Sequence, residues 1–200
     1  MGIKLYYTPR TRAVRVRWLL EELALPYEPV NIDIFNGEGS TDEYKQIHPL
    51  GCVPALEVDG EVIFESGAVC DWLTDLHADK NLAPSIDSIL RMKYKQWFYF
   101  ILATMEPHAW NIVLHRNILP KEQRIPEIVT TSEKQYVESL SVIEEELRGK
   151  EFLLGKQFST LDILLTTLLT WMPKQVKPFE NTYEYMKKMR TRKAYKLVVD

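Results

Sequence analysis

Apolar positions in the first 76 residues switch between strand-like and helix-like spacing. Residues 3–7 form a short β-prone run that Thr8-Pro9 ends. Helical spacing follows until Pro26, and residues 27–34 alternate again as a strand does. A loop over 36–40 leads to a short helix predicted over 42–47. The first helix has a predicted apolar stripe of Val16, Leu19, Leu20 and Leu23.

The next two apolar runs, 53–58 and 62–64, flank Asp59-Gly60, the strongest short hairpin signal in the chain. Ser66 is then expected to cap a helix that runs through Leu76. The order βαβαββα combines a strand-helix-strand crossover and a hairpin in one sheet, which predicts a thioredoxin-like domain over residues 1–76. The predicted buried stripe of its last helix is Val69, Trp72, Leu73 and Leu76.

From residue 88 onward the apolar positions follow helical spacing alone. Residues 77–87 are rich in turn formers and are expected to be a linker. Ser159 and Asp162 resemble a capping box, with Asp in place of the usual Glu. The predicted fold class is therefore α/β followed by an all-α domain over 88–200. One or two long helices are expected over 88–117, and further helices over 127–148, 161–171, 182–189 and 192–199. The segment 161–171 is apolar almost all round, as a core helix is.

Composition and charge narrow the possible partners. The chain has 200 residues, of which 46% are apolar and 26% charged, with a net charge of −3. That balance predicts no nucleic-acid partner. Residues 1–76 carry a net −7 and residues 77–200 a net +4, which indicates two units of different character. The longest near-apolar stretch is about half the ~20 residues of a membrane span, so no membrane partner is expected.

The two cysteines, Cys52 and Cys70, form no CxxC motif and belong to no Cys/His cluster. No secretory apolar segment precedes the first strand. We therefore expect a reduced, cytoplasmic setting and no metal site. Cys52 is interpreted as a partly buried inert thiol and Cys70 as a core residue.

Four short motifs occur at intervals along the whole chain. Each is weak alone, but the set at these separations resembles the cytosolic glutathione transferase family, in particular its bacterial-type members. The motifs are Tyr6-Tyr7-Thr8-Pro9, Leu50-Gly51-Cys52-Val53-Pro54-Ala55-Leu56, Glu65-Ser66, and Phe158-Ser159-x-x-Asp162.

The resemblance implies a glutathione site in the first domain. In this family the proline that matches Pro54 is cis, which turns the Val53 backbone outward to pair with an extended peptide. Ser66 would bind the γ-glutamyl carboxylate at a helix N-terminus, and Glu65 would bind the amino group. The alternative is an ordinary helix start with an acid beside it.

The resemblance also implies a group that stabilises the glutathione thiolate. Family members use Tyr, Ser or Cys near the end of the first strand. Here the candidate hydroxyls, in order of preference, are Thr11, Thr8 and Tyr7. Arg12 stands where bacterial relatives with this start often carry a cysteine, which removes mixed-disulfide chemistry and adds a cation. Arg10 and Arg15 crowd the same helix start, and these arginines either attract an anion, point to solvent or pair with acids elsewhere.

Cys52 is a second departure, because related chains often carry Lys, Arg or Gln there to meet the glycyl carboxylate. His48 and Lys45 are the alternatives for that contact, and lower affinity is another. The electrophile would lie against the helical domain, where a core role is the competing interpretation of each wall residue. The candidate walls are Tyr94, Trp97, Phe98, Met105, His108, Trp110 and Trp171.

The sequence thus predicts a cytoplasmic, homodimeric glutathione transferase that conjugates glutathione to small hydrophobic electrophiles, as in detoxification. Glutathione is the implied co-substrate. The alternative is a non-catalytic protein of the same fold that binds apolar ligands or a protein partner. A glutathione-dependent thiol–disulfide reductase is disfavoured by the missing active-site cysteine.

Overall fold

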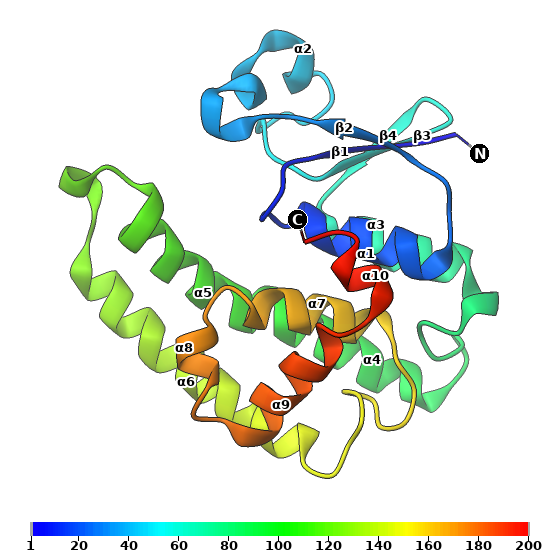
Figure 1. Cartoon of the computed structure of the whole chain (residues 1–200), viewed down its shortest axis with the longest axis vertical. Helices are drawn as coiled ribbons and strands as arrows, with labels where there is room; N and C mark the ends of the chain where they lie inside the picture. Colours follow the sequence, from blue (N-terminus) through cyan, green and yellow to red (C-terminus); the bar gives the residue numbers. More distant parts are fainter. Residues whose placement is uncertain (1, 200) are drawn as a thin grey trace. The chain divides into compact units, whose positions relative to one another are not determined.

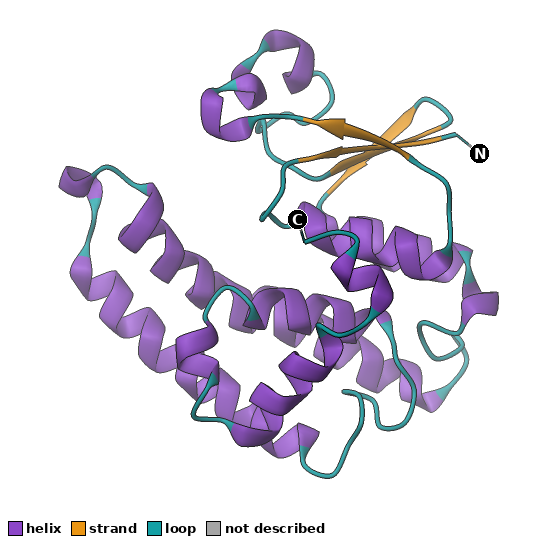
Figure 2. Cartoon of the chain, in the orientation of Figure 1, coloured by secondary structure: helices purple, strands orange, loops and turns teal. Residues whose placement is uncertain are grey.

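The computed structural model describes residues 2–199 and contains one four-stranded sheet (Figure 2). Its strands, in the order β2-β1-β3-β4, pair in parallel between β1 and β2 and antiparallel elsewhere. This mixed sheet confirms the predicted thioredoxin-like arrangement. The strands are β1 (Ile3–Tyr7), β2 (Glu28–Asn31), β3 (Ala55–Val58) and β4 (Glu61–Phe64).

Helices α1 (Ala13–Leu23) and α3 (Ser66–Leu76) lie on one face of the sheet (Figure 1). The predicted stripe of α1 is buried at all four positions. On α3 the prediction was half wrong, because Trp72 and Leu76 are 38% and 49% exposed. The residues of α3 that are buried are Ser66, Gly67, Val69, Cys70, Leu73 and Thr74, so residues 72 and 76 lie outside its buried face. A short helix, α2 (Asp42–Lys45), precedes β3.

The C-terminal segment belongs to the same unit as the sheet. Helix α10 (Lys193–Lys196) packs on α1, where the rings of Trp18 and Tyr195 meet edge to face at 4.8 Å. Arg192 donates two hydrogen bonds to the Glu22 carboxylate, at 2.7 and 2.8 Å. The two compact units are therefore residues up to Asn81 together with the segment from Thr191, and Leu82–Arg190. These divisions differ from the predicted domains 1–76 and 88–200, because helical spacing cannot show which unit a terminal helix contacts.

The second unit is entirely helical (Figure 2). Every residue of α7 (Thr160–Leu169) is buried, which confirms it as the core helix. Wider π-helical turns at Phe100–Met105 and Leu114–Ile118 interrupt the long helix expected over 88–117. The other helices are α4 (Ile89–Tyr99), α5 (Glu106–Val113), α6 (Pro126–Leu147), α8 (Pro173–Val176) and α9 (Glu180–Met189). Short 3-10 turns occur at Ile34–Asn36, Glu38–Ser40, Ala78–Lys80 and Lys121–Gln123.

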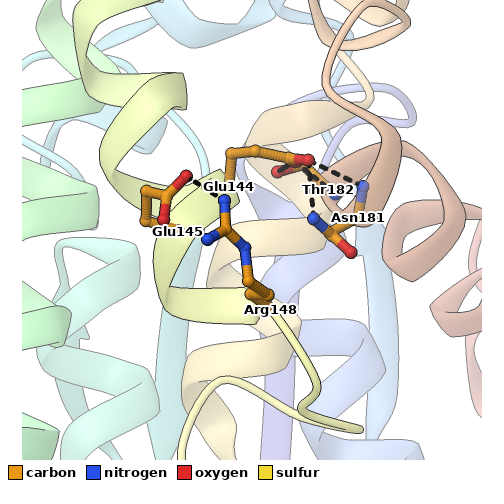
Figure 3. Close-up of polar contacts among 5 residues, drawn as sticks. All are labelled: Glu144, Glu145, Arg148, Asn181 and Thr182. Carbon is orange, nitrogen blue, oxygen red and sulfur yellow. Dashed lines mark hydrogen bonds and ion pairs between the residues drawn. The ribbon is translucent and has the colours of Figure 1, made fainter.

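Two carboxylates stabilise helix starts in this unit. Asp162 accepts from the Ser159 backbone N–H at 2.7 Å, so the predicted capping box is present. Glu144, on α6, accepts four hydrogen bonds from the backbone and side chains of Asn181 and Thr182 at the start of α9 (Figure 3). Burial opposes the charged form of Glu144, but these hydrogen bonds outweigh it and lower the pKa.

Candidate functional site

The strand register brings three predicted site segments to one end of the sheet. Tyr6 pairs with Ala55, and Ala55 pairs with Phe64. The residues that follow β1, precede β3 and follow β4 therefore lie at the same end of the sheet. These segments contain nine of the ten residues that the sequence nominated for catalysis or glutathione binding, and the tenth, Tyr7, is the last residue of β1.

Ser66 is the first residue of α3 and is 5% exposed. The prediction that Ser66 caps this helix was wrong by one residue, because the N-cap is Glu65. Glu65 adopts φ 71° and ψ 107°, a sparsely populated conformation for a residue with a side chain, and its side chain makes no capping hydrogen bond. Such conformations gather at functional sites, and here the turn leaves the first amides of α3 without a side-chain cap.

Arg15 is the functional candidate whose role the sequence did not reveal. Its side chain is fully buried on α1, and Nη1 donates to Ser66 Oγ at 3.3 Å. Arg15 stands three and four positions before Trp18 and Leu19, so its place on the buried stripe was the available signal. Burial raises the pKa of the neighbouring Cys70 thiol to about 12, with the Arg15 charge acting in the opposite direction. Cys70 is thus the core thiol that was predicted.

The segment before β3 carries a cis peptide between Val53 and Pro54. No turn, loop or cap hydrogen bond in residues 2–199 uses the Val53 backbone. The Tyr44 hydroxyl donates to the carbonyl of Cys52 at 2.7 Å and holds the segment from one side. Gly51 has φ 64°, and a Cβ there would overlap the backbone oxygen of Gly39, so only glycine fits.

Two polar residues of this loop differ in exposure. The Cys52 side chain is exposed, which corrects the expectation of a partly buried thiol, because the loop turns it away from the core. His48 is 5% exposed; its ring packs on Phe64 at 4.9 Å, and Nδ1 accepts from the Leu50 N–H at 3.2 Å. Burial lowers the pKa of His48, and the charge of Glu65 acts in the opposite direction.

The hydroxyls after β1 are engaged by the backbone. Thr8 is buried, and its Oγ1 donates to the carbonyl of Ile32. Thr11 is half-buried; Oγ1 donates to the Thr8 carbonyl at 2.7 Å and accepts from the Ala13 N–H at 3.2 Å. Half-buried Arg12 is the N-cap residue of α1.

Tyr7 is the last residue of β1. Its half-buried ring lies 4.7 Å from the Arg17 guanidinium carbon, in a cation–π contact. Tyr6, its neighbour, instead donates its hydroxyl to Glu57 at 2.7 Å. Tyr7, the tyrosine that the sequence nominated, thus has a different environment from Tyr6.

The proposed wall residues of the helical unit divide into two groups. Tyr94, Trp97, Phe98 and Met105 are core residues, each at most 5% exposed. His108, Trp110 and Trp171 are half-buried, and the two indole rings meet at 6.5 Å.

Residues 2–199 include no helix long and apolar enough to cross a membrane. In the same described part of the chain, no group of three or more His, Cys, Asp or Glu side chains is placed to hold a metal ion.

Known glutathione transferases resemble this chain over most of its length. Glutathione S-transferase 3 of Schizosaccharomyces pombe is 26% identical over 212 residues, which are 99% of this chain and 87% of that protein. Glutathione S-transferase GstA of Escherichia coli O157:H7 is 28% identical over 171 residues, 84% and 82% of the two chains. A glutathione transferase homologue from Sulfitobacter, solved with bound glutathione, shares the fold with a TM-score of 0.86 at 23% identity, covering 98% of this chain and 96% of that one.

The family profiles divide between the two units. The glutathione S-transferase N-terminal domain matches residues 1–75, and the C-terminal domain matches residues 100–193. Together with the mixed sheet, the cis Val53–Pro54 peptide and the helical second unit, these matches show that the chain belongs to the glutathione S-transferase family.

Proposed function

We propose that this protein is a cytoplasmic enzyme that binds glutathione, stabilises its thiolate and conjugates it to a small hydrophobic electrophile. The observation that carries the proposal is that the segments after β1, before β3 and after β4 meet at one end of the sheet. The Sulfitobacter homologue with bound glutathione supports the choice of ligand.

The start of α3 suits the γ-glutamyl end of glutathione. Because Arg15 donates to Ser66 Oγ, the hydroxyl hydrogen of Ser66 can be donated to a carboxylate. The amides at the helix start and the buried Arg15 charge favour the same anion. Glu65 supplies a carboxylate for the ammonium group. The Val53 backbone N–H and C=O would pair with the cysteinyl residue as a short added strand.

For the thiolate we retain Thr11 as the first candidate, with Arg12 as the nearby cation. Thr8 is buried and directed toward Ile32, which favours a structural role. Thr11 is more exposed, and its hydroxyl can turn from the Thr8 carbonyl to a ligand. A hydrogen bond to a charged group contributes about 1.5–3 kcal/mol, which lowers a thiol pKa by roughly one to two units.

The test is a glutathione titration followed by ultraviolet difference absorbance of the thiolate near neutral pH. Thr11→Val should abolish the thiolate signal, and Thr11→Ser should retain it because the hydroxyl remains. Ser66→Ala should weaken binding itself about tenfold or more. An unchanged thiolate signal in Thr11→Val would transfer the role to Tyr7, for which Tyr7→Phe is the matching variant.

A second candidate function is glutathione or apolar-ligand binding without catalysis. It is favoured by one observation, namely that the hydroxyls of both Thr8 and Thr11 already donate to backbone carbonyls. Binding of glutathione without any thiolate signal in the wild type would select this function. Turnover of an aromatic electrophile in a variant lacking both Cys52 and Cys70 would select the transferase and exclude a protein thiol.

We also propose a homodimer formed between the first unit of one copy and the helical unit of the other. The opposite net charges of the two parts of the chain support this pairing. Each unit also presents large exposed apolar residues. In the first unit these include Val62, Phe64, Trp72 and Leu76, and on α4 they include Ile89, Leu90, Met92 and Tyr99. Trp72→Glu should shift the protein to monomers in sedimentation velocity, whereas the wild type should sediment as a dimer.

A further inference from the structure

His48 occupies an unusual position for a polar side chain next to the proposed glutathione site. It is 5% exposed, it packs its ring on Phe64, and its Nδ1 accepts the Leu50 amide at 3.2 Å. The carbonyl of His48 also accepts from the Gly51 N–H at 2.8 Å. One residue therefore provides two acceptors for the turn that leads into Cys52 and Val53.

The position of this turn is fixed closely. Gly51 lies against the Gly39 backbone, and Tyr44 holds the carbonyl of Cys52. The turn cannot move far without displacing the Val53 backbone, since only Cys52 separates Gly51 from Val53. Together with Tyr44, the His48 imidazole therefore links the shape of the turn to the Val53 backbone, which is proposed to receive the cysteinyl residue.

Protonation removes this acceptor. A neutral imidazole has one acceptor nitrogen, and the imidazolium has none, so a charged His48 would direct a second N–H toward the Leu50 amide. Burial favours the neutral form, as the lowered pKa of His48 indicates. The charged group that acts on the ring is Glu65, at the start of α3, and it favours the imidazolium. The neutral ring therefore predominates at pH 7, and acid converts it.

We propose that His48 is a positioning residue whose neutral imidazole holds the Leu50–Val53 segment ready for glutathione, so that glutathione binding weakens in acid. The proposal rests on the proposed function, because glutathione is the ligand that Val53 would receive. It assigns His48 an indirect role in place of a direct contact with the glycyl carboxylate.

The experiment is a calorimetric titration with S-methylglutathione from about pH 5 to about pH 8, the range in which histidine titrates. This probe has no thiol proton, so ionisation of the ligand sulfur cannot contribute to the pH profile. His48→Asn keeps an acceptor, because an Asn side chain can accept from the amide two residues on, but it does not titrate in this range. His48→Phe keeps a ring against Phe64 and loses the acceptor.

A matched control is available in the helical unit. His115 Nδ1 accepts the Ile125 amide at 3.1 Å, which is the same chemistry outside the loop. His115→Asn should therefore leave the pH profile of binding unchanged. Circular dichroism of each variant at both ends of the pH range establishes that it is folded.

We expect wild-type affinity to fall about tenfold at the acid end, the value of one hydrogen bond. His48→Asn should bind with a nearly flat profile, and His48→Phe should bind about tenfold more weakly across the range. A wild-type pH slope that persists in His48→Asn, or wild-type affinity in His48→Phe at about pH 8, would overturn the proposal. Absence of wild-type binding at that pH would instead overturn the proposed function and this inference with it.

Discussion

Two helix starts in this protein each carry a serine and an acidic residue, but in opposite order along the chain. At α7, Ser159 is extended at φ −142°, and the Asp162 carboxylate accepts from its backbone N–H and its hydroxyl, at 2.7 and 2.9 Å. At α3, Glu65 holds φ 71°, no side chain caps the helix, and the Ser66 hydroxyl accepts from Arg15. The start of α7 is capped by its own carboxylate, whereas the start of α3 has no cap from its N-cap side chain and lies beside the Arg15 guanidinium.

The difference separates a structural helix start from a ligand site. An internal carboxylate at α7 takes the place that an anion would occupy, so this end can only stabilise the fold. At α3 the acid stands before the serine rather than three residues after it, and the strained Glu65 makes no capping hydrogen bond to the helix amides. The same Ser/acid pairing therefore acts as a cap in one order and, in our proposal, as a glutathione subsite in the other.

The largest loss of stability should come from removing the carboxylate that caps the start of α7. Asp162 is fully buried and accepts four hydrogen bonds, from Leu153, Ser159 and Tyr185. Asp162→Ala leaves these donors without an acceptor in the core, which should lower the free energy of unfolding by about 3–5 kcal/mol. Urea denaturation measures the loss. Tyr185→Phe removes only one of the donors, so a loss in that variant as large as in Asp162→Ala would contradict this account.

A smaller effect is expected at α9, whose start is capped from another helix (Figure 3). Glu144→Gln removes the charge that four donors share, which should cost about 2 kcal/mol at neutral pH. Because the native pKa of Glu144 is lowered, its contribution is present above the unfolded pKa of about 4.3 and is lost as pH falls through the native value. Urea denaturation should therefore show that the difference in the free energy of unfolding between wild type and Glu144→Gln becomes smaller in acid.

The neighbouring Glu145 is the matched control. It pairs with Arg148 at 2.5 Å, but both side chains are about two-thirds exposed. Such pairs contribute little, so Glu145→Gln should change stability by less than about 0.5 kcal/mol at any pH. A loss equal to that of Glu144→Gln would mean that the general loss of charge on α6, and not the cap, stabilises the unit.

The smallest losses of stability are expected at the two serines, which should differ in their effect on glutathione affinity. Ser159→Ala should cost about 1 kcal/mol of stability and leave glutathione affinity unchanged. Ser66→Ala removes an acceptor of the buried Arg15 guanidinium, so it should also cost about 1 kcal/mol of stability, but it should weaken glutathione binding about tenfold. Thermal unfolding and glutathione titration of both variants provide the measurements. If both serines affect stability and affinity alike, the distinction between the two helix starts is wrong.

Much of the fold followed from local pattern. Residues 3–7 satisfied strand spacing and a Thr-Pro stop, and Asp59-Gly60 satisfied a hairpin turn, so each needed no distant contact. The Ser159–Asp162 box is likewise local, because its two partners lie within one helical turn. The four family motifs could be read in the same way, and with them the expectation of a cis peptide at Pro54.

The tertiary structure decided where side chains point and what lies beside them. Helical spacing marked Trp72 and Leu76 as core, but the face of α3 that α1 and the sheet cover does not reach them. The sequence left open whether Arg15 attracts an anion, points to solvent or pairs with an acid, whereas in the structure it donates to Ser66, 51 positions away. His48 Nδ1 accepts a hydrogen bond from the Leu50 N–H, and only the folded turn brings these two groups together. Period and propensity act over a few residues, whereas burial and pairing depend on contacts between distant segments, so sequence determined the elements and structure determined the site.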